Sequence, residues 1–325
     1  MTHFFLRLSA PVLITLGLLC GQALAQNYPT KPMRLIVPTA PGGGYDFVGR
    51  VLAEKLSAEL GQAMVVENRT GSGTVVGTQA AAAAAPDGYT LLMGGLANIA
   101  FTPGLYDKLP YNPATDFVPV ALAGSFSYTL IARKDLPLNT LQEVMDFARA
   151  NPGKLTIATG GTGTGQHVAA ALLKSLAHVN ILEVPYKGAQ PAYTDLFGGR
   201  VDLFFDNTAT VRPFLEGDRV KAIVTSNASR DPLLPQVPFG REAGLPGLVL
   251  ESWIGIFAPS QTPAPVVETL RTAMGKVMQQ ADLRKRLEGS GVRVFNMPAK
   301  ETEQFVKAEA DKWPKFLRQA GIKAE

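Results

Sequence analysis

A short apolar run, a glycine-rich loop and an amphipathic helix follow one another near the start of the chain, and this unit limits the fold more than any other stretch. Residues 34–38 have the apolar composition of a buried strand. The loop Thr39–Asp46 then carries consecutive glycines, and residues 48–60 place apolar side chains at helical spacing, with Asp46 suited to cap the helix. Because the first turn of a helix leaves backbone N–H groups unpaired, this arrangement can bind an anion.

The glycine loop fits neither of the common nucleotide-binding patterns. It lacks the lysine and the Ser/Thr of a Walker loop, and its glycines do not follow the Gly-x-Gly-x-x-Gly spacing of a dinucleotide site. A tight strand-to-helix turn that binds nothing explains the loop equally well. A second, independent signal is therefore needed to assign this loop to ligand binding.

The same order of strand, glycine loop and helix recurs along the chain. After an apolar strand at 64–67, the polar loop Asn68–Gly73 leads into a helix. The strand at 89–93 ends in a further glycine-containing loop that reaches Asn98. This repetition predicts an α/β fold with a parallel sheet, whose binding loops meet at the carboxyl ends of the strands.

A second loop of the same type lies in the middle of the chain. The strand at 155–158 opens into Gly160–His167, which contains four glycines and precedes a helix. The two glycine loops, about 120 residues apart, would each supply one half of a site from a different domain.

The first 25 residues have the composition of a signal peptide. Arg7 supplies a positive charge, residues 11–19 are apolar, and Ala23-Leu24-Ala25 is a cleavage signature. Cleavage would remove Cys20, the only cysteine, and would leave about 300 of the 325 residues, enough for two domains. We therefore expect an exported, soluble protein of the bacterial periplasm.

Two apolar stretches, 118–132 and 248–258, predict strands that cross from one domain to the other. Helices at the C-terminus would return to the first domain, and Pro314 predicts a bend or break in the last of them. The predicted domain 1 comprises residues 26–124 and 251–325, and domain 2 comprises residues 125–250.

The residues with catalytic potential form no recognisable set. There is no Gly-x-Ser-x-Gly elbow and no His-Glu-x-x-His motif, and two histidines without cysteines argue against a zinc site. His167, at the start of a helix, would either donate to a ligand oxygen or bond to its own loop. Asp46 and Asp206 both adjoin strand ends, where capping explains them. The sequence predicts no catalytic residue, no metal and no cofactor.

Charge excludes a nucleic-acid partner. The formal net charge is +4, and no basic run is interleaved with aromatic residues. Four aromatic residues, in contrast, flank the predicted loop ends: Tyr45, Phe101, Phe126 and Tyr186. Aromatic side chains usually fill a core. Tyr45 stands inside a glycine loop, where we expect no core to fill, and we expect its ring to face a ligand.

Several segments spread over nearly the whole chain form a specific pattern. They are Val37-Pro38-x-x-Pro41-Gly42-Gly43-Gly44-x-Asp46, Val66-Glu67-Asn68-Arg69-x-Gly71-x-Gly73, Pro86-Asp87-Gly88-Tyr89-Thr90-Leu91-Leu92, Pro103-Gly104-Leu105-Tyr106-Asp107-Lys108-Leu109-Pro110-Tyr111, Gly163-x-Gly165-x-His167, Val184-Pro185-Tyr186-Lys187-Gly188, Glu242-Ala243-Gly244-Leu245-Pro246-Gly247 and Trp253-x-Gly255-x-x-Ala258-Pro259. In this order they resemble the periplasmic solute receptors of tripartite tricarboxylate transporters, the Bug-type receptors.

The resemblance implies a two-lobed periplasmic-binding-protein fold of type II, a Venus flytrap with a ligand cleft between its domains. It implies a monomer that is not an enzyme, captures a small organic carboxylate and delivers it to the inner-membrane permease subunits of the transporter. The family's ligand loops would map onto Thr39–Asp46 and Gly160–His167, and Asp206 would approach the other end of the ligand. The predicted ligand-binding residues are Thr39, Gly43, Gly44, Tyr45, Asp46, Asn98, Gly161, Thr162, Gly163, Thr164, His167, Tyr186 and Asp206.

Tyr45 differs from the small residue that many relatives place after the third glycine. Its ring would shorten the cleft and offer a flat apolar face, and Phe101 and Phe126 would extend that face. No cluster of Arg or Lys is present in either loop to neutralise three carboxylates. We therefore predict a mono- or dicarboxylate with an aromatic or other flat apolar body. The alternatives are an exported enzyme acting on a small carboxylate and a receptor that feeds a membrane sensor.

Overall fold

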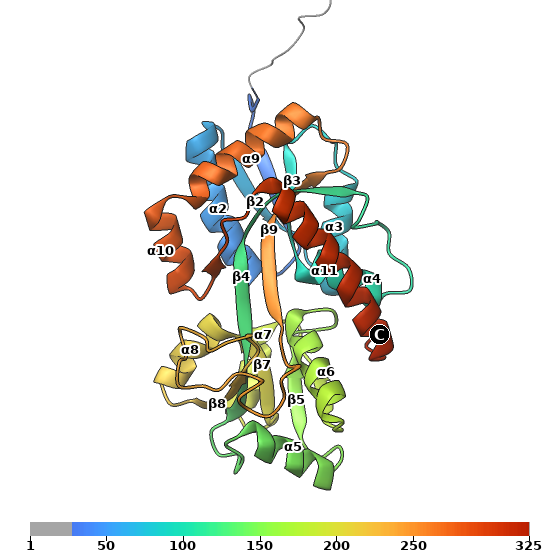
Figure 1. The fold of residues 1–325 in the computed structure, drawn as a ribbon, viewed down its shortest axis with the longest axis vertical. Coiled ribbons are helices and arrows are strands. Elements are labelled where there is room, and N and C mark those ends of the chain that lie inside the picture. The colour runs from blue at the N-terminus through green and yellow to red at the C-terminus, as the bar shows by residue number, and fades with distance from the viewer. Residues whose placement is uncertain (1–27, 325) are drawn as a thin grey trace, which may run out of the picture.

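The chain folds into two lobes that are stacked along the long axis of the molecule and joined by strands at their centre (Figure 1). This computed structural model describes residues 28–324. Each lobe is built around its own β-sheet, and one long strand belongs to both sheets. The predicted signal peptide, residues 1–25, lies outside the described residues.

The first lobe contains a mixed sheet with a parallel part from the N-terminal third of the chain. Strand β1 (Met33–Val37) lies between β2 (Met64–Asn68) and β3 (Thr90–Gly95) and pairs in parallel with both. The antiparallel strands β9 (Glu251–Pro259) and β4 (Phe117–Arg133) continue the sheet beyond β3. The other elements of this lobe are α2 (Gly44–Leu60), the 3₁₀ turn η2 (Ser72–Thr74), α3 (Val75–Ala82), the π-helix η3 (Leu96–Phe101), α4 (Thr102–Leu105), α9 (Ala264–Met278), α10 (Ala281–Gly289), the short strand β10 (Arg293–Val294) and α11 (Ala299–Gln319).

The second lobe has the same arrangement of parallel and antiparallel strands in a smaller sheet. Strand β5 (Thr156–Thr159) pairs in parallel with β6 (Leu182–Pro185) and with β7 (Leu203–Asn207). The C-terminal part of β4 pairs antiparallel with β7 on one side and with β8 (Val220–Thr225) on the other. The helices of this lobe are α5 (Leu141–Ala150), α6 (Gly165–Ala177), α7 (Ala189–Phe197) and α8 (Thr208–Glu216).

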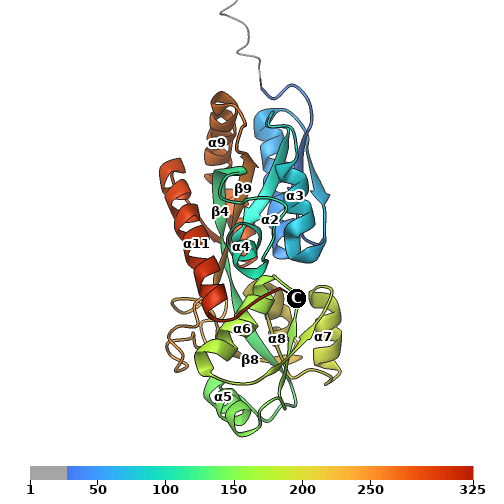
Figure 2. The same ribbon diagram turned by 90° about the vertical axis from the view of Figure 1, so that its right-hand side faces the viewer.

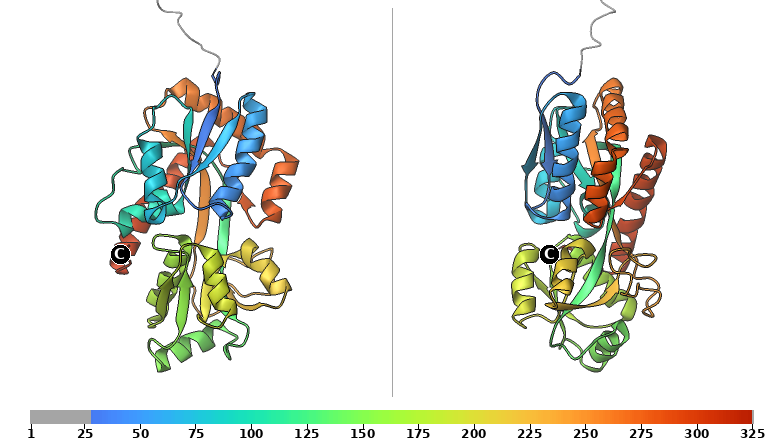
Figure 3. Two further views of the ribbon diagram at one scale, coloured as in Figure 1. Left: turned by 180° about the vertical axis from the view of Figure 1, so that it is seen from behind. Right: turned by 90° about the vertical axis from the view of Figure 1, so that its left-hand side faces the viewer.

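Strand β4 connects the two sheets, and Figure 3 shows it passing between the lobes from behind. Its residues up to Ser127 pair with β9, and from Tyr128 onward they pair with β7. The crossing strand predicted at 118–132 is therefore confirmed. The return connection is different, because β9 pairs only with strands of the first lobe. The chain crosses back near Leu250, whose N–H donates to the Ser226 carbonyl at 2.9 Å.

Apolar residues fill both lobes. The main core runs through the first lobe and continues into the second, with Trp253, Phe101 and Phe257 among its largest buried side chains. A smaller core around Tyr193 and Phe204 packs on one face of the second sheet. Helix α11 runs along one side of the first lobe, and the C-terminus ends near the junction of the lobes (Figure 2).

Two local predictions differ from the structure. Of the bend or break predicted at Pro314, the break is wrong, because helix α11 continues through this residue. A proline costs about 3 kcal/mol inside a helix. Pro314 is buried and packs closely against α4, where a Cβ on Gly104 would lie only 2.7 Å from Pro314 Cα. The segment after β3 is not a loop either. Residues 96–105 form the π-helix η3 and α4, and π-helices are rare elements that often mark functional regions.

Candidate functional site

The first glycine loop carries the chain from the carboxyl end of β1 into helix α2. Gly42 has a φ of +84°, a left-handed conformation that favours glycine, and Gly43 precedes the helix with an extended backbone. Gly43 has no side chain and therefore provides no cap for the helix. The first-turn N–H groups of α2 thus keep the positive end of a helix dipole open to an anion.

Asp46 shapes this loop. The prediction that it caps α2 is wrong, because Asp46 lies in the first turn of the helix, after the cap residue Gly43. Its carboxylate accepts from the Gly42 N–H at 2.9 Å, from Asn68 Nδ2 at 2.9 Å and from Arg50 Nε at 3.0 Å. Burial alone would raise the pKa of Asp46, but these hydrogen bonds and the Arg50 charge hold it below its usual value. The buried carboxylate therefore holds the loop in place.

The second glycine loop leads from β5 into α6, and its own side chains brace it. Thr164 caps α6 by accepting from the His167 N–H at 3.4 Å, and its hydroxyl donates to the Gly161 carbonyl at 2.7 Å. His167 Nδ1 accepts from the Gly163 N–H at 3.2 Å, while Nε2 lies 3.4 Å from Glu183 Oε2. Of the two roles expected for His167, the structure shows the bond to its own loop.

The loops of the two lobes meet at the junction. A Cβ on Gly44 would lie 3.5 Å from Asn207 Nδ2, which belongs to the second lobe. A Cβ on Gly73 would lie 2.2 Å from the Thr162 carbonyl oxygen, again across the junction. Asn207 was not among the predicted site residues. Its Nδ2 faces the first glycine loop while its Oδ1 caps α8, a position that follows from tertiary packing and not from a local motif.

Tyr45 does have a core around it, contrary to expectation. Its side chain is only 6% exposed, and its hydroxyl accepts from the Ala97 N–H at 3.2 Å. Burial raises the pKa of Tyr45 well above its ordinary value. The ring fills the space over Gly95, where a Cβ would lie 2.4 Å from the Tyr45 hydroxyl oxygen. Tyr45 thus packs the first lobe beneath the loop.

Asn98 also lies in the interior of the first lobe. It is fully buried, and its Oδ1 accepts from the Gly95 N–H at 2.9 Å while Nδ2 donates to Thr78 Oγ1 at 3.1 Å. These bonds fix the start of the π-helix η3. The side chain has no surface left for a ligand, so its predicted role as a direct contact is not supported.

Asp206 and Tyr186 are bonded within the second lobe. Asp206 lies inside β7 and is 3% exposed, with bonds from Tyr193 Oη at 2.8 Å and from Gln166 Nε2 at 3.1 Å. Burial raises the pKa of Asp206 to about 6, against the opposing effect of these bonds. Tyr186 Oη donates to Asp195 at 2.7 Å. Burial, together with this bond to Asp195, raises the pKa of Tyr186 to about 12.

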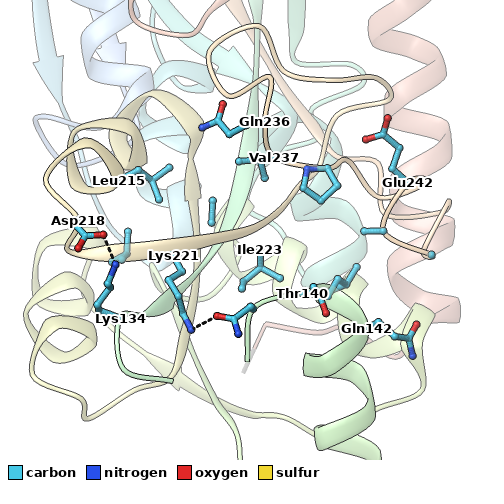
Figure 4. Close-up of a pocket in the computed structure, with 17 residues that line it drawn as sticks. Lys134, Thr140, Gln142, Leu215, Asp218, Lys221, Ile223, Gln236, Val237 and Glu242 are labelled. Atoms are coloured by element: carbon cyan, nitrogen blue, oxygen red, sulfur yellow. Dashed lines mark hydrogen bonds and ion pairs between the residues drawn. The ribbon is translucent and has the colours of Figure 1, made fainter. Parts of the chain in front are cut away.

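A separate cavity of about 870 Å³ lies within the second lobe, between β8, the start of α5 and residues 236–244. Figure 4 shows Lys221 at its edge, where Nζ donates to Asn139 Oδ1 at 2.8 Å. None of the predicted site residues lines this cavity. Within residues 28–324, no group of three or more His, Cys, Asp or Glu side chains is placed to hold a metal ion.

Two lobes joined by a shared strand, with glycine loops from both lobes meeting at the junction, define a periplasmic binding protein of class II-like architecture. The chain belongs to the tripartite tricarboxylate transporter family of receptors, whose model matches residues 48–322. This is a family of transport receptors and not of enzymes, as the sequence predicts. No helix among the described residues is long and apolar enough to cross a membrane.

Three solved structures show the likeness over nearly the whole chain. The periplasmic binding protein BugD is 34% identical and covers 91% of this chain and all of its own, with a TM-score of 0.84. Rpa4515 of R. palustris with adipate is 32% identical over 90% of this chain and 98% of its own, also with a TM-score of 0.84. MatC of Rhodopseudomonas palustris with bound malate is 35% identical over 89% of this chain and 99% of its own, with a TM-score of 0.82.

Proposed function

We propose that this protein captures a small organic carboxylate between its two lobes and delivers it to the membrane permease of a tripartite tricarboxylate transporter. The observation that carries the proposal is that both glycine loops lie at the lobe junction, where the first faces Asn207 of the second lobe and the second contacts Gly73 of the first lobe. Each loop stands before a helix N-terminus, where a carboxylate finds N–H donors and a favourable dipole. Membership of the receptor family and the carboxylates bound by Rpa4515 and MatC support it.

The proposed ligand contacts come from the loops themselves. In the first loop these are the backbone groups of Gly43 and Gly44 and the hydroxyl of Thr39, whose Oγ1 is buried and has no partner among residues 28–324. In the second loop they are the backbone groups around Gly161 and Thr162. The other predicted residues already form hydrogen bonds within their own lobes, and we assign them to holding the loops in shape. They are Tyr45, Asp46, Asn98, Gly163, Thr164, His167, Tyr186 and Asp206.

The ligand is proposed to carry one or two carboxylates. Neither loop contains a cluster of Arg or Lys to neutralise a third, and desolvating an unpaired charge is costly. The predicted aromatic body has less support, because Tyr45, Phe101 and Phe126 are 6%, 0% and 5% exposed. Adipate and malate, the ligands of two solved relatives, are aliphatic dicarboxylates.

Calorimetry with malate, adipate, succinate, terephthalate, a substituted benzoate and citrate tests the ligand class. We expect a mono- or dicarboxylate to bind more tightly than citrate. A preference for terephthalate or the benzoate would favour the predicted aromatic body. Tightest binding of citrate would contradict the limit of two carboxylates and would leave the receptor role intact.

A pair of glycine variants tests the site. Gly43 is exposed and a Cβ there meets nothing closer than 3.8 Å, so Gly43→Leu should fold normally and fill the space before α2. Gly275 on α9 is equally exposed, with open space around it, and serves as the matched control. We expect Gly43→Leu to abolish carboxylate binding and Gly275→Leu to retain it. Equal affinity of the two variants would place the site elsewhere.

We further propose that the mature protein begins at Gln26 and is a monomer of the periplasm. The signal-peptide composition of residues 1–25 and the periplasmic origin of BugD support this location. N-terminal sequencing of the protein from the periplasmic fraction should start at Gln26. Recovery of the intact N-terminus in the cytoplasmic fraction would contradict export.

A further inference from the structure

The segment from Gly71 to Thr74 has an unusual backbone at the lobe junction. Ser72, Gly73 and Thr74 have φ values of 42°, 57° and 94°, so three consecutive residues occupy the left-handed region. This conformation is unfavourable for residues with a Cβ and most of all for β-branched threonine. Such strain persists only where surrounding contacts enforce it, and it is concentrated at functional sites.

The 71–74 segment is the point at which the first lobe presses on the second glycine loop. A Cβ on Gly73 would lie 2.2 Å from the Thr162 carbonyl oxygen, a distance that no side chain tolerates. From the other side, a Cβ on Gly163 would lie 3.5 Å from the Gly73 carbonyl oxygen and 3.5 Å from Leu105 Cδ1. The contact thus depends on bare backbone on both sides of the junction.

Tyr106 holds the 71–74 segment in this position. Its hydroxyl donates to the Ser72 carbonyl at 2.8 Å and lies 3.7 Å from the Cβ position of Gly163. No contact of Tyr106 was predicted from the sequence. The side chain is half-buried, and its hydroxyl is bonded to the first lobe while it lies next to the loop of the second.

The backbone that carries Tyr106 is held in place by the C-terminal part of the chain. Tyr106 directly follows α4, and the Leu105 carbonyl at the end of that helix accepts from the Ala324 N–H at 2.9 Å. Arg318 donates to the Pro103 carbonyl at 2.6 Å, so the C-terminal helix α11 clamps α4 from a second point. Because Tyr106 extends from a fixed helix and holds the strained 71–74 segment, the arrangement favours one relative position of the lobes.

We infer that Tyr106 is a positioning residue for lobe closure: it holds the strained 71–74 segment against the Thr162–Gly163 loop and so sets the balance between touching and separated lobes. Its relevance to ligand capture rests on the proposed function. The ratio of touching to separated lobes is a property of the protein without ligand, and it can be measured when no ligand is present.

Spin labels on the two lobes test this inference. Val65 on β2 and Leu182 on β6 are 55% and 56% exposed and lie on different lobes. Both can be replaced by cysteine in the chain that begins at Gln26, which contains no other cysteine. Distance distributions are recorded without ligand for the parent, for Tyr106→Phe and for Gly73→Ala. Tyr89→Phe is the matched control, because it removes a hydroxyl whose bonds go to Thr30 in the first lobe.

We expect Tyr106→Phe to lower the ratio of touching to separated lobes by about three- to tenfold, which corresponds to the loss of one hydrogen bond. Gly73→Ala should lower it further, and Tyr89→Phe should leave it unchanged. A distribution identical to the parent in both Tyr106→Phe and Gly73→Ala would overturn the inference. Because no ligand is present, that result would leave the proposed receptor function standing.

Discussion

At the scale of single residues, Asp206 shows how a buried carboxylate is retained. Its two oxygens are occupied by Tyr193 and Gln166, which offset part of the cost of removing a charge from water. The offset is incomplete, since the pKa is raised to about 6. The native state therefore binds the Asp206 proton more tightly than the unfolded chain does.

This difference predicts a pH dependence. Because the pKa of Asp206 is higher in the folded protein than in the unfolded chain, its contribution to stability is present at low pH and is lost as the pH rises through about 6. Between pH 7 and pH 5 the parent should gain about 1.4 kcal/mol of unfolding free energy relative to Asp206→Asn. Urea unfolding of both proteins at the two pH values measures the gain. If the difference in unfolding free energy between the two proteins is the same at both pH values, Asp206 does not titrate in this range.

Tyr45 leads to a second prediction for a single residue. Replacing Tyr45 by Phe leaves the buried Ala97 N–H without its acceptor, which should cost about 1–3 kcal/mol of unfolding free energy. Since the ring packs the first lobe, carboxylate affinity measured by calorimetry should change little. Reduced affinity with unchanged stability would instead put the hydroxyl in contact with the ligand.

At the scale of elements, helices α5 and α6 have the same type of cap in different places. Thr140 caps α5 by accepting from the Glu143 N–H at 3.2 Å, on the exposed surface of the second lobe. Thr164 caps α6 and also ties down the Gly161 carbonyl beside the lobe junction. The two threonines therefore separate the effect of a lost cap from the effect on the glycine loop.

We expect Thr140→Ala and Thr164→Ala each to lower the unfolding free energy by about 1 kcal/mol, the usual value for a lost cap. Only Thr164→Ala should weaken carboxylate binding, because it also releases the second glycine loop. Thermal unfolding and calorimetry of the pair provide the measurement. Equal affinity in both variants would mean that the loop does not depend on its cap.

At the scale of the whole molecule, the lobes are joined near one point. Strand β4 changes partners between Ser127 and Tyr128, and the return chain passes at Leu250 beside it. Ser127 Oγ donates to Asp231 at 2.6 Å and lies 2.8 Å from Thr208 Oγ1, so a buried polar network surrounds the change of partners. Few connections at one place permit a hinge.

A hinge at this place predicts a change in shape. The radius of gyration from X-ray scattering should decrease when a carboxylate identified by the calorimetric series saturates the protein, because bound ligand stabilises the closed arrangement. The Gly43→Leu variant under the same conditions is the control and should not change. An unchanged radius for a demonstrably saturated parent would rule out a lobe closure driven by ligand.

Local sequence patterns predict the alternation of strands, glycine loops and helices, and with it the α/β class and the long crossing strand. These features follow from local periodicity and from the conformational freedom of glycine, which act over a few residues. The segments 39–46 and 160–167 could be identified as glycine loops before helices for the same reason, and their pairing in one site remains a prediction. Their order along the chain also carried the resemblance to transport receptors.

The contacts of the individual side chains, in contrast, depend on tertiary packing. Tyr45 proved to be buried because Gly95 and Ala97, some 50 residues later in the chain, close over it. Asp206 proved to bond to Tyr193 and Gln166, and Tyr106 to Ser72, across separations that no local pattern encodes. Such contacts depend on how distant elements pack, so a loop can be predicted from its own residues while its neighbours cannot.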